Sequence, residues 1–487
     1  MHSQKSAQTP MKDRYEVLND PIFEKVGGVA DAMEREAYVV GGYVRDLLLG
    51  LPSKDIDFVT VGSGIELARN VAKALGHNAR LATFTNYGTA QVTAPGIDLE
   101  FVGARKESYS RDSRNPIVED GTLADDLSRR DFTINAMAIS VNRENFGQLV
   151  DMFDGLSDLE RKVIRTPLDP DTTFSDDPLR MLRAIRFATR LGFTIDPETF
   201  KSIKRNAGRM EIITRERIND ELMKIMRTSR PSVGFKTLDM AGLLPFVLPE
   251  LEALKGVETR EGKGHKDNFE HTLKVLDNVA AASDDEWLRW AALLHDIAKP
   301  VVKRWDSKLG WTFHAHNIVG EKMVAKIFRK MKMPQNEKMK FVAKMVGMHM
   351  RPQNVAEEGV TDSGVRRLIT DAGEDIDSLM TLCEADITSK NPEKVRRQLE
   401  GFKALRKRME EVQAADDYRN WKNPINGREI MQRLGIAPGP RIAEIKEAVK
   451  EAILDGKVPN EHDAAWNFVE RFIAADSARR QTKNISE

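Results

Sequence analysis

The chain has 487 residues, which corresponds to roughly two to four domains, and its 75 Lys and Arg residues balance its 75 Asp and Glu residues. Because the net charge is zero, any binding of nucleic acid has to come from local basic patches. The single cysteine, Cys383, excludes an internal disulfide, a thiolate zinc site and an iron–sulfur cluster, so any metal has to bind Asp, Glu or His. The apolar runs are shorter than the roughly 18 residues of a membrane-spanning helix and the start is polar, so we expect a cytoplasmic protein without membrane spans.

The first part of the chain alternates strand and helix patterns. Residues 38–40 form an apolar strand that runs into Gly41–Gly42. An amphipathic helix is expected at 65–75, and short strands are expected at 56–61, 89–93 and 99–102. This alternation predicts a small α/β domain within residues 39–150.

Helical spacing dominates from Pro178 onward. Apolar residues recur at helical intervals through 179–191, 217–226 and 231–240. Breaks between helical parts are expected at 255–266, which holds three glycines, at Asn391–Pro392 and at 423–427. The predicted fold class is therefore α+β, with a small mixed α/β head followed by mostly α-helical domains, and the first residues are expected to form a disordered tail.

Two carboxylates follow the glycine turn. Asp55 and Asp57 are two apart in a predicted strand, so both point to the same face, whereas Ile56 and Phe58 face the core. Such a pair can hold the divalent ions that stabilise the attacking and leaving oxygens in phosphoryl and nucleotidyl transfer. Taken alone, an Asp-x-Asp pair is more often an exposed pair on an edge strand.

Further groups could complete a site around this pair. The glycine turn would let backbone amides approach a phosphate, and Arg45 would add a two-pronged donor. Glu100, on the predicted neighbouring strand, is a candidate third catalytic carboxylate, with a solvated strand face as the alternative.

A cluster of charged residues opens the predicted helix at 179–191. Arg180, Arg183 and Arg186 share one helix face, and Asp177 is expected in the first turn, behind a Ser175 cap. A carboxylate accepts from the amino group of cytosine or adenine and a guanidinium donates to their acceptors, so such a pair could select a base without a template. The alternative is an acidic first turn that complements the helix dipole, followed by a solvated arginine stripe.

The order of these motifs is specific. The glycine turn and Asp55-x-Asp57 are followed by RRDFTINAMA at 129–138 and SDDPLRMLRAIRF at 175–187. Over most of residues 39–246 the chain resembles the class II tRNA nucleotidyltransferase and bacterial poly(A) polymerase family, the CCA-adding enzymes. The resemblance implies a palm-like nucleotidyltransferase head, then helical neck, body and tail domains that hold the tRNA acceptor arm.

The resemblance also implies residue roles. Asp55 and Asp57 would bind Mg²⁺, Gly42 and Arg45 would contact the triphosphate, and Arg130 would contact the nucleotide. The residues that would read and hold the incoming CTP or ATP are Asp177, Arg180, Arg183 and Arg186. Residues 104–116 resemble the family's mobile loop, although Ser113 and Asn115 depart from its most familiar version.

Histidines and aspartates form a second constellation in the helical half. Imidazole and carboxylate without sulfur suit Mn, Fe, Ni, Co, Mg or Zn. The segment resembles the HD phosphohydrolase domain, whose ligand order His, His-Asp, Asp matches His271, His295, Asp296 and Asp386. His316 and His349 match the extra histidines of binuclear members, and His314 lies beside them. The alternative is a scaffold domain whose histidines only form hydrogen bonds inside a helical bundle.

The resemblances suggest a division of the chain and a function. The expected parts are a tail at 1–20, a nucleotidyltransferase head at 21–165, a helical neck at 166–254, an HD domain at 255–390 and a tRNA-binding helical tail at 391–487. The expected activity is addition of CMP and AMP to the tRNA 3′ end, with a metal-dependent phosphohydrolase attached. Open alternatives are addition of A only or CC only, poly(A) synthesis, the HD domain as the main activity, and a non-catalytic RNA-binding module.

Overall fold

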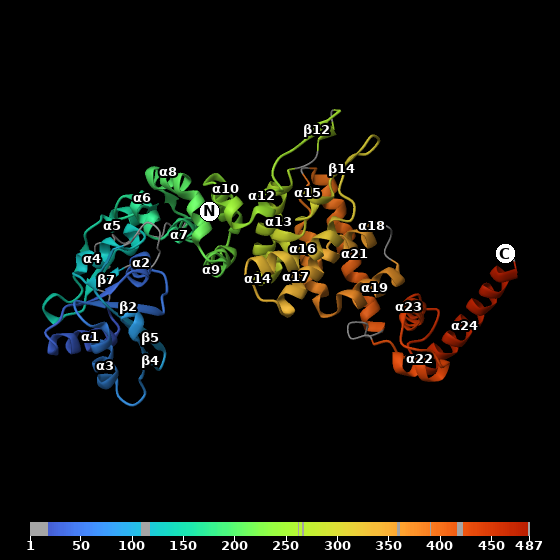
Figure 1. Cartoon of the computed structure of the whole chain (residues 1–487), viewed down its shortest axis with the longest axis horizontal. Helices are drawn as coiled ribbons and strands as arrows, with labels where there is room; N and C mark the ends of the chain where they lie inside the picture. Colours follow the sequence, from blue (N-terminus) through green and yellow to red (C-terminus); the bar gives the residue numbers. More distant parts are fainter. Residues whose placement is uncertain are drawn as a thin grey trace, which may run out of the picture. The chain divides into compact units, whose positions relative to one another are not determined.

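The computed structural model describes residues 18–108, 117–261, 263–264, 267–357, 361–389, 391–415 and 422–485. The chain divides into two compact units, one ending at Glu252 and one beginning at Ala253 (Figure 1). Most of the expected tail therefore lies outside the described residues, although Asp20 already caps the first helix by accepting a hydrogen bond from the Ile22 amide. None of the described helices has the length and apolar composition that crossing a bilayer requires.

A seven-stranded mixed sheet forms the core of the first unit. In spatial order its strands are β3 (Arg80–Phe84), β4 (Thr89–Ala94), β5 (Ile97–Gly103), β2 (Asp55–Thr60), β1 (Ala37–Val40), β8 (Met137–Ser140) and β9 (Leu149–Asp151). The β2–β5 pair is parallel and the other pairs are antiparallel. The predicted strands at 38–40, 56–61, 89–93 and 99–102 are confirmed, whereas β3 was not predicted because all of its residues are exposed and it has no apolar alternation.

The two faces of this sheet are covered differently. Helices α1 (Pro21–Ala32) and α3 (Gly64–Leu75) cover one face, where the ring of Phe23 lies 6.1 Å from that of Phe58. The other face packs against α4 (Leu123–Ser128) through a cluster that includes Val40, Val59 and Leu127. Because Asp57 pairs in register with Val40, its side chain lies on the α4 face of the sheet.

Short elements join the head strands, and a helical neck completes the first unit. The connecting elements are α2 (Gly42–Leu49), β6 (Arg105–Ser108), β7 (Ile117–Asp120), α5 (Gly155–Arg161), β10 (Val163–Ile164) and β11 (Thr194–Ile195). The neck helices are α6 (Pro170–Asp176), α7 (Leu179–Leu191), α8 (Pro197–Asn206), α9 (Arg215–Met226), α10 (Pro231–Met240), α11 (Leu244–Val247) and α12 (Pro249–Glu252). The predicted helices at 65–75, 179–191, 217–226 and 231–240 are confirmed as α3, α7, α9 and α10.

The second unit is built almost entirely of helices. Its helices are α13 (Asn268–Ala282), α14 (Glu286–Leu294), α15 (Lys299–Val302), α16 (His316–Lys330), α17 (Glu337–Met348), α18 (Arg351–Glu357), α19 (Asp362–Ala372), α20 (Ile376–Ala385), α21 (Pro392–Ala415), α22 (Gly427–Leu434), α23 (Pro440–Leu454) and α24 (His462–Ile485). Two small hairpins, β12 (Thr259–Arg260) with β13 (Lys263–Gly264) and β14 (Arg304–Asp306) with β15 (Gly310–Thr312), interrupt them. The last three helices enclose a cluster of their own around Ile430, Val449 and Trp466. The structure thus has the α+β class that the sequence predicts.

The packing of α1 against the sheet gives a stability test with a control on the same helix. A Cβ atom at Gly27 would lie 1.8 Å from the Val141 carbonyl oxygen, whereas a Cβ at Gly28 meets nothing within 4 Å. We expect Gly27→Ala to lower the free energy of unfolding by about 3 kcal/mol, because backbone has to move, and Gly28→Ala to raise it by up to about 1 kcal/mol through helix propensity. Urea unfolding of both variants checks this, and equal stabilities would contradict the packing.

Candidate nucleotide site and candidate metal centre

The turn after β1 forms one wall of a cavity in the first unit. Gly41 has φ of +72°, a conformation that side chains disfavour, and a Cβ there would lie 2.8 Å from Arg130 Nη1. This turn starts α2, whose N-terminus with Gly42 opens into a cavity of about 470 Å³. A helix N-terminus beside an arginine favours an anion.

Arg45 lines the same cavity, and neighbouring side chains hold its guanidinium group. Its side chain is buried, donates to Asp46 Oδ1 over 2.8 Å and to Asn135 Oδ1 over 2.7 Å, and lies over the Phe187 ring at 4.9 Å. These contacts fix the guanidinium in place. Nη2 also lies 2.7 Å from Asp46 Oδ1, so all three guanidinium nitrogens are engaged and fewer N–H groups remain for a phosphate than the sequence suggests.

The two predicted metal ligands both lie on β2, and their neighbours Ile56 and Phe58 are buried as predicted. In the parallel β2–β5 pair, Asp57 lies opposite Glu100. Asp57 lines the cavity, whereas Asp55 and Glu100 are exposed and are not part of its wall.

The electrostatics of Asp57 fit a bound cation. Burial, with the charges of Glu100 and Asp55, raises the pKa of Asp57 to about 6, and Arg130 only partly opposes this. A divalent ion among the carboxylates would remove this repulsion, and an all-oxygen donor set suits Mg²⁺.

Helix α7 supplies the opposite wall. Arg180, Arg183 and Arg186 all line the cavity, and Arg186 is only 7 % exposed, so the alternative of a solvated arginine stripe is wrong. Arg180 donates to the Arg129 carbonyl oxygen over 2.7 Å, Arg183 pairs with Asp131 at 2.6 Å, and Arg186 pairs with Glu221 at 2.6 Å.

Asp177 does not lie in the first turn of α7, and the predicted Ser175 cap is wrong. Ser175 belongs to α6, and Pro178 takes the N-cap position of α7 because a proline cannot continue the preceding helix. Asp177 therefore lies between the two helices, where its carboxylate accepts from the Leu179 amide at 3.1 Å.

Sequence reasoning missed several residues of this cavity. Arg217 at the start of α9 donates to both carboxylate oxygens of Asp177, at 2.7 and 3.3 Å. Behind the cavity wall, the fully buried Asp126 pairs with both Arg129 and Arg130, which line it. The sequence around a single charged residue does not show such contacts. The partner of Arg217 is 40 residues away, and the partners of Asp126 are neighbours only once the helix has formed.

The predicted mobile loop is only partly described. Its first residues form β6, which pairs with β7 on the far side of the loop. Residues 109–116, with Ser113 and Asn115, lie outside the described residues.

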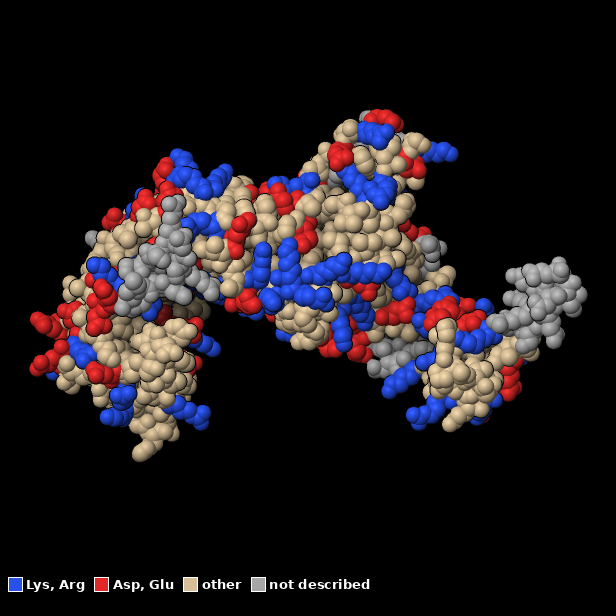
Figure 2. Space-filling model, viewed as in Figure 1, with Lys and Arg blue, Asp and Glu red and all other residues tan. Residues whose placement is uncertain are grey.

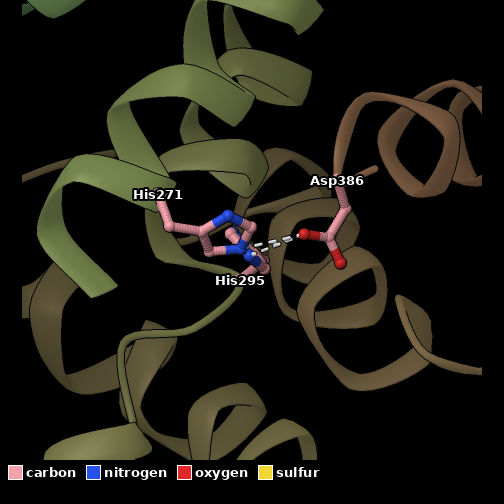
Figure 3. Close-up of side chains that lie close together, drawn as sticks. All are labelled: His271, His295 and Asp386. Atoms are coloured by element: carbon pink, nitrogen blue, oxygen red, sulfur yellow. Dashed lines mark ion pairs between the residues drawn. The ribbon is translucent and has the colours of Figure 1, made fainter. Parts of the chain in front are cut away.

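Histidines and aspartates from separate helices meet inside the second unit. His271 on α13, His295 after α14 and Asp386 after α20 point toward one another (Figure 3). Asp386 Oδ1 lies 2.9 Å from His271 Nε2 and 3.7 Å from His295 Nε2. Three of the predicted ligands therefore come together from helices that are far apart in the sequence.

Asp296 joins this group to a second one. Its Oδ2 lies 3.5 Å from His271 Nε2 and 3.2 Å from His295 Nε2, while its Oδ1 lies 3.4 Å from His316 Nε2. His349 completes the second group, with Nε2 at 4.0 Å from the same Oδ1. His314 is exposed and belongs to neither group. One carboxylate placed between two sets of imidazoles is the arrangement of a two-metal centre with a bridging ligand.

The imidazole orientations favour metal binding over a purely structural role. Nδ1 of His295, His316 and His349 donates to a backbone carbonyl oxygen at 2.7–2.8 Å, so each Nε2 faces the centre and is an acceptor when the imidazole is neutral. His316 Nε2 and His349 Nε2 lie 3.3 Å apart, and burial lowers the pKa of both residues, that of His349 to about 4. Two neutral acceptors this close repel unless a cation binds them.

The remaining groups also fit a cation. Among the described residues, His295 Nε2 is buried without a hydrogen bond of good geometry, although Asp296 Oδ2 lies 3.2 Å away. Burial would raise the pKa of Asp296, but His295, Lys299 and His271 outweigh it and hold this pKa well below its usual value. An ionised buried carboxylate with imidazole acceptors on both sides suits a transition metal.

Three segments of the chain match known domain families. Residues 37–165 match the poly A polymerase head domain, residues 192–255 match the probable RNA and SrmB-binding site of polymerase A, and residues 268–391 match the HD domain. The A-adding tRNA nucleotidyltransferase of Deinococcus radiodurans is 34 % identical over 447 residues, which cover 90 % of this chain and 95 % of that protein. The multifunctional CCA protein of Hahella chejuensis is 36 % identical over 312 residues, 62 % of this chain and 69 % of that protein.

Solved structures extend the similarity to the fold. A tRNA nucleotidyltransferase complexed with a primer tRNA and an incoming ATP analogue superposes with a TM-score of 0.56 at 29 % identity, covering 78 % of this chain and 98 % of that chain. The motif order, the carboxylates on β2 beside the arginine-lined cavity and the relative that matches nearly end to end agree. The chain is therefore a member of the tRNA nucleotidyltransferase family that carries a poly A polymerase head domain and an HD domain.

Proposed function

We propose that this enzyme adds C and A residues from CTP and ATP to the 3′ end of tRNA without a nucleic-acid template. The observation that carries the proposal is the cavity in which Asp57, the Gly41–Gly42 turn and the arginines of α7 face one another. It combines a carboxylate for metal, amides for phosphate and side chains that can read a base edge.

The proposed reaction is an in-line displacement. The terminal ribose hydroxyl attacks the α-phosphate of the nucleotide, and pyrophosphate leaves. Divalent ions held by Asp55 and Asp57 would supply activation of the hydroxyl and neutralisation of the leaving group. Arg130 and the α2 N-terminus bind phosphate oxygens, while Arg180 and Arg183 place positive charge on the opposite wall.

Base choice is assigned to Asp177 and its neighbours. A carboxylate accepts from the exocyclic amine that cytosine and adenine share and that uracil lacks. Arg217 donates a hydrogen bond to each carboxylate oxygen of Asp177, which fixes the plane of the carboxylate. Arg180 stands in the same wall and supplies donors for ring acceptors.

RNA binding needs a local basic surface, because the net charge of the chain is zero. Lys and Arg gather over α16 and α17 in the second unit (Figure 2). The exposed basic residues there are Lys322, Lys326, Arg329, Lys330, Lys332, Lys338 and Lys340. This surface would bind the phosphate backbone without reading sequence.

A second candidate is addition of A alone, because the relative that matches nearly the whole chain is named an A-adding enzyme. The two activities separate on tRNA transcripts that lack CCA, CA or A, each incubated with labelled CTP or ATP. Incorporation of CTP on transcripts lacking CCA or CA supports the proposal. Incorporation of ATP alone, only after CC, supports the second candidate, and repeated A addition would indicate a poly(A) polymerase.

For the HD domain we propose a metal-dependent phosphohydrolase. A bound transition-metal pair would supply an activated water and polarise a phosphate. The residues that would hold it are His271, His295, Asp296, His316, His349 and Asp386. The Nε2 atoms of His316 and His349, 3.3 Å apart and both without a proton in the neutral imidazoles, support this assignment over a scaffold role.

The carboxylates of the head can be tested against one another. We expect Asp57→Asn and Asp55→Asn each to lower nucleotide addition at least about 1,000-fold, because each removes charge from the metal site without opening the core. Asp98→Asn, which changes the exposed residue opposite Asp55 on β5, is the matched control and should retain wild-type activity. Glu100→Gln should lower nucleotide addition as the changes at Asp55 and Asp57 do, and not retain activity as Asp98→Asn does. Near-normal addition by Asp57→Asn would disprove the metal assignment.

The base-reading assignment predicts a change of specificity. Asp177→Ala and Arg217→Ala should both lower the preference for CTP and ATP over UTP and GTP by about 10-fold or more. Asp177→Ala removes the carboxylate that accepts from the base, and Arg217→Ala removes the side chain that holds this carboxylate in place. The measurement is single-nucleotide incorporation with each of the four nucleotides. Glu216→Ala, at an exposed neighbour on α9, should leave the preference unchanged. Unchanged discrimination in Asp177→Ala would contradict the assignment.

The HD centre should be separable from nucleotide addition. After loading with Mn²⁺, Ni²⁺ or Co²⁺, the double variant His295→Ala, Asp296→Ala is expected to hold at least about 10-fold less metal and to lose hydrolysis of phosphate esters. Mg²⁺-dependent addition to tRNA should stay within a few-fold. Elemental analysis and both assays on one preparation make the measurement, and His314→Ala, at the exposed histidine outside the groups, is the control. A wild type that neither binds these metals nor hydrolyses esters would indicate a scaffold.

A further inference from the structure

The HD centre opens into a cavity whose far wall comes from another helix. This cavity of about 530 Å³ is lined at one end by His271, Asp386 and Lys299, and at the other by Lys394 and Gln398 of α21. Helix α21 follows the segment that matches the HD domain, which ends at residue 391. The wall opposite the metal ligands therefore lies outside the part that defines the domain.

A second cavity continues the first along α21. It measures about 330 Å³ and shares Gln353, Lys394 and Gln398 with the first, and it adds Arg397 at its own wall. The two form one trough that leads from the metal ligands to two basic side chains. Its acidic wall residue, Glu357, already accepts a hydrogen bond from the Gln353 amide at 2.8 Å.

Helix α21 is fixed in this position by packing and ion pairs. Its own Phe402 and Leu405 are buried, and its Arg406 donates to both oxygens of Glu384 on α20, at 2.6 and 3.1 Å. Arg408 pairs with Asp362 at the start of α19. The basic residues of the trough therefore stand at a set position relative to the metal ligands.

The size and charge of the trough indicate its ligand. A single phosphate would fill a small part of a cavity of this size, which is typical of organic ligands. The metal ligands and Lys299 mark a place for one phosphate, and Lys394 with Arg397 marks a place for a second. The glutamines between them offer donors and acceptors to a sugar or base. Two phosphates separated by a nucleoside are the repeat of an oligonucleotide.

We propose that the HD trough takes the phosphorylated end of an oligonucleotide, with the terminal phosphate at the metal ligands and the next phosphate at Lys394 and Arg397. The inference rests on the proposed phosphohydrolase function. Water attacks the terminal phosphorus, the ester P–O bond breaks, and the nucleoside hydroxyl leaves with the proton from water. Lys394 and Arg397 act by positioning the substrate and take no part in bond cleavage.

The test compares two substrate lengths in two charge-matched variants of the Mn²⁺-loaded full chain. The probes are dinucleotides with a 3′- or a 5′-terminal phosphate, and the corresponding nucleoside monophosphates. The wild type should hydrolyse one of the dinucleotides with a kcat/KM about 10-fold or more above that of the monophosphate. Lys394→Gln with Arg397→Gln should remove this advantage by raising KM for the dinucleotide, at the metal content of the wild type.

The control removes the same charge from another face of α21. Arg396 and Lys403 line a different cavity, so Arg396→Gln with Lys403→Gln should keep the dinucleotide advantage. Calorimetric binding of a dinucleotide whose terminal phosphate is replaced by a phosphonate, with CH2 in place of the bridging ester oxygen, gives a readout without turnover, and only the first variant should weaken it about 10-fold. Equal kcat/KM for dinucleotide and monophosphate would disprove the subsite but not the hydrolase function. The same holds if the Lys394→Gln, Arg397→Gln variant keeps the dinucleotide advantage. A metal-loaded wild type that hydrolyses no probe would overturn the phosphohydrolase function and the subsite with it.

Discussion

The ion pair between Arg183 and Asp131 joins the neck to the head, and the nucleotide cavity depends on it. Asp131 is buried on the head side, and its carboxylate also accepts from the Phe132 amide and from the Asn135 side chain, both at 2.9 Å. Burial would raise the pKa of Asp131, but Arg183 and Asn135 outweigh it and hold this pKa below its usual value. A buried carboxylate of this kind is stable only while its hydrogen-bond and ion-pair partners stay in place. The pair therefore fixes the position of α7 relative to the motif at 129–138.

This one contact explains why the arginines of α7 stand along a cavity wall and not in solvent. Each arginine is tied at one side to the head or to α9, as in the pairs of Arg180 with the Arg129 carbonyl and of Arg186 with Glu221. The other side of the wall faces the cavity. Long side chains lose conformational entropy when they bind a ligand. Arginines that are already held in place lose less of it, so ligand binding costs less free energy.

Both candidate sites bring groups of one kind near each other. In the head, Asp57 faces the carboxylates of Asp55 and Glu100, and in the second unit His316 and His349 face each other with acceptor nitrogens. The donor atoms differ, since the first set offers only oxygen and the second mixes nitrogen with oxygen. An all-oxygen set suits a hard ion such as Mg²⁺ and a mixed set suits a transition metal, so the two sites would bind different metals.

Sequence by itself determined the fold class, the strands with apolar alternation and the long amphipathic helices, because these depend on a local period. It also brought out Asp55 and Asp57, since spacing along one strand decides which side chains share a face, and the His295–Asp296 pair, through its resemblance to the ligand order of the HD domain. Only the tertiary structure decided where α7 begins, that Arg217 grips Asp177, that Asp296 stands between two sets of imidazoles, and that α21 walls the HD cavity. Those contacts join residues from different elements, most of them far apart along the chain, and no periodic pattern encodes which two distant charges meet when the helices pack.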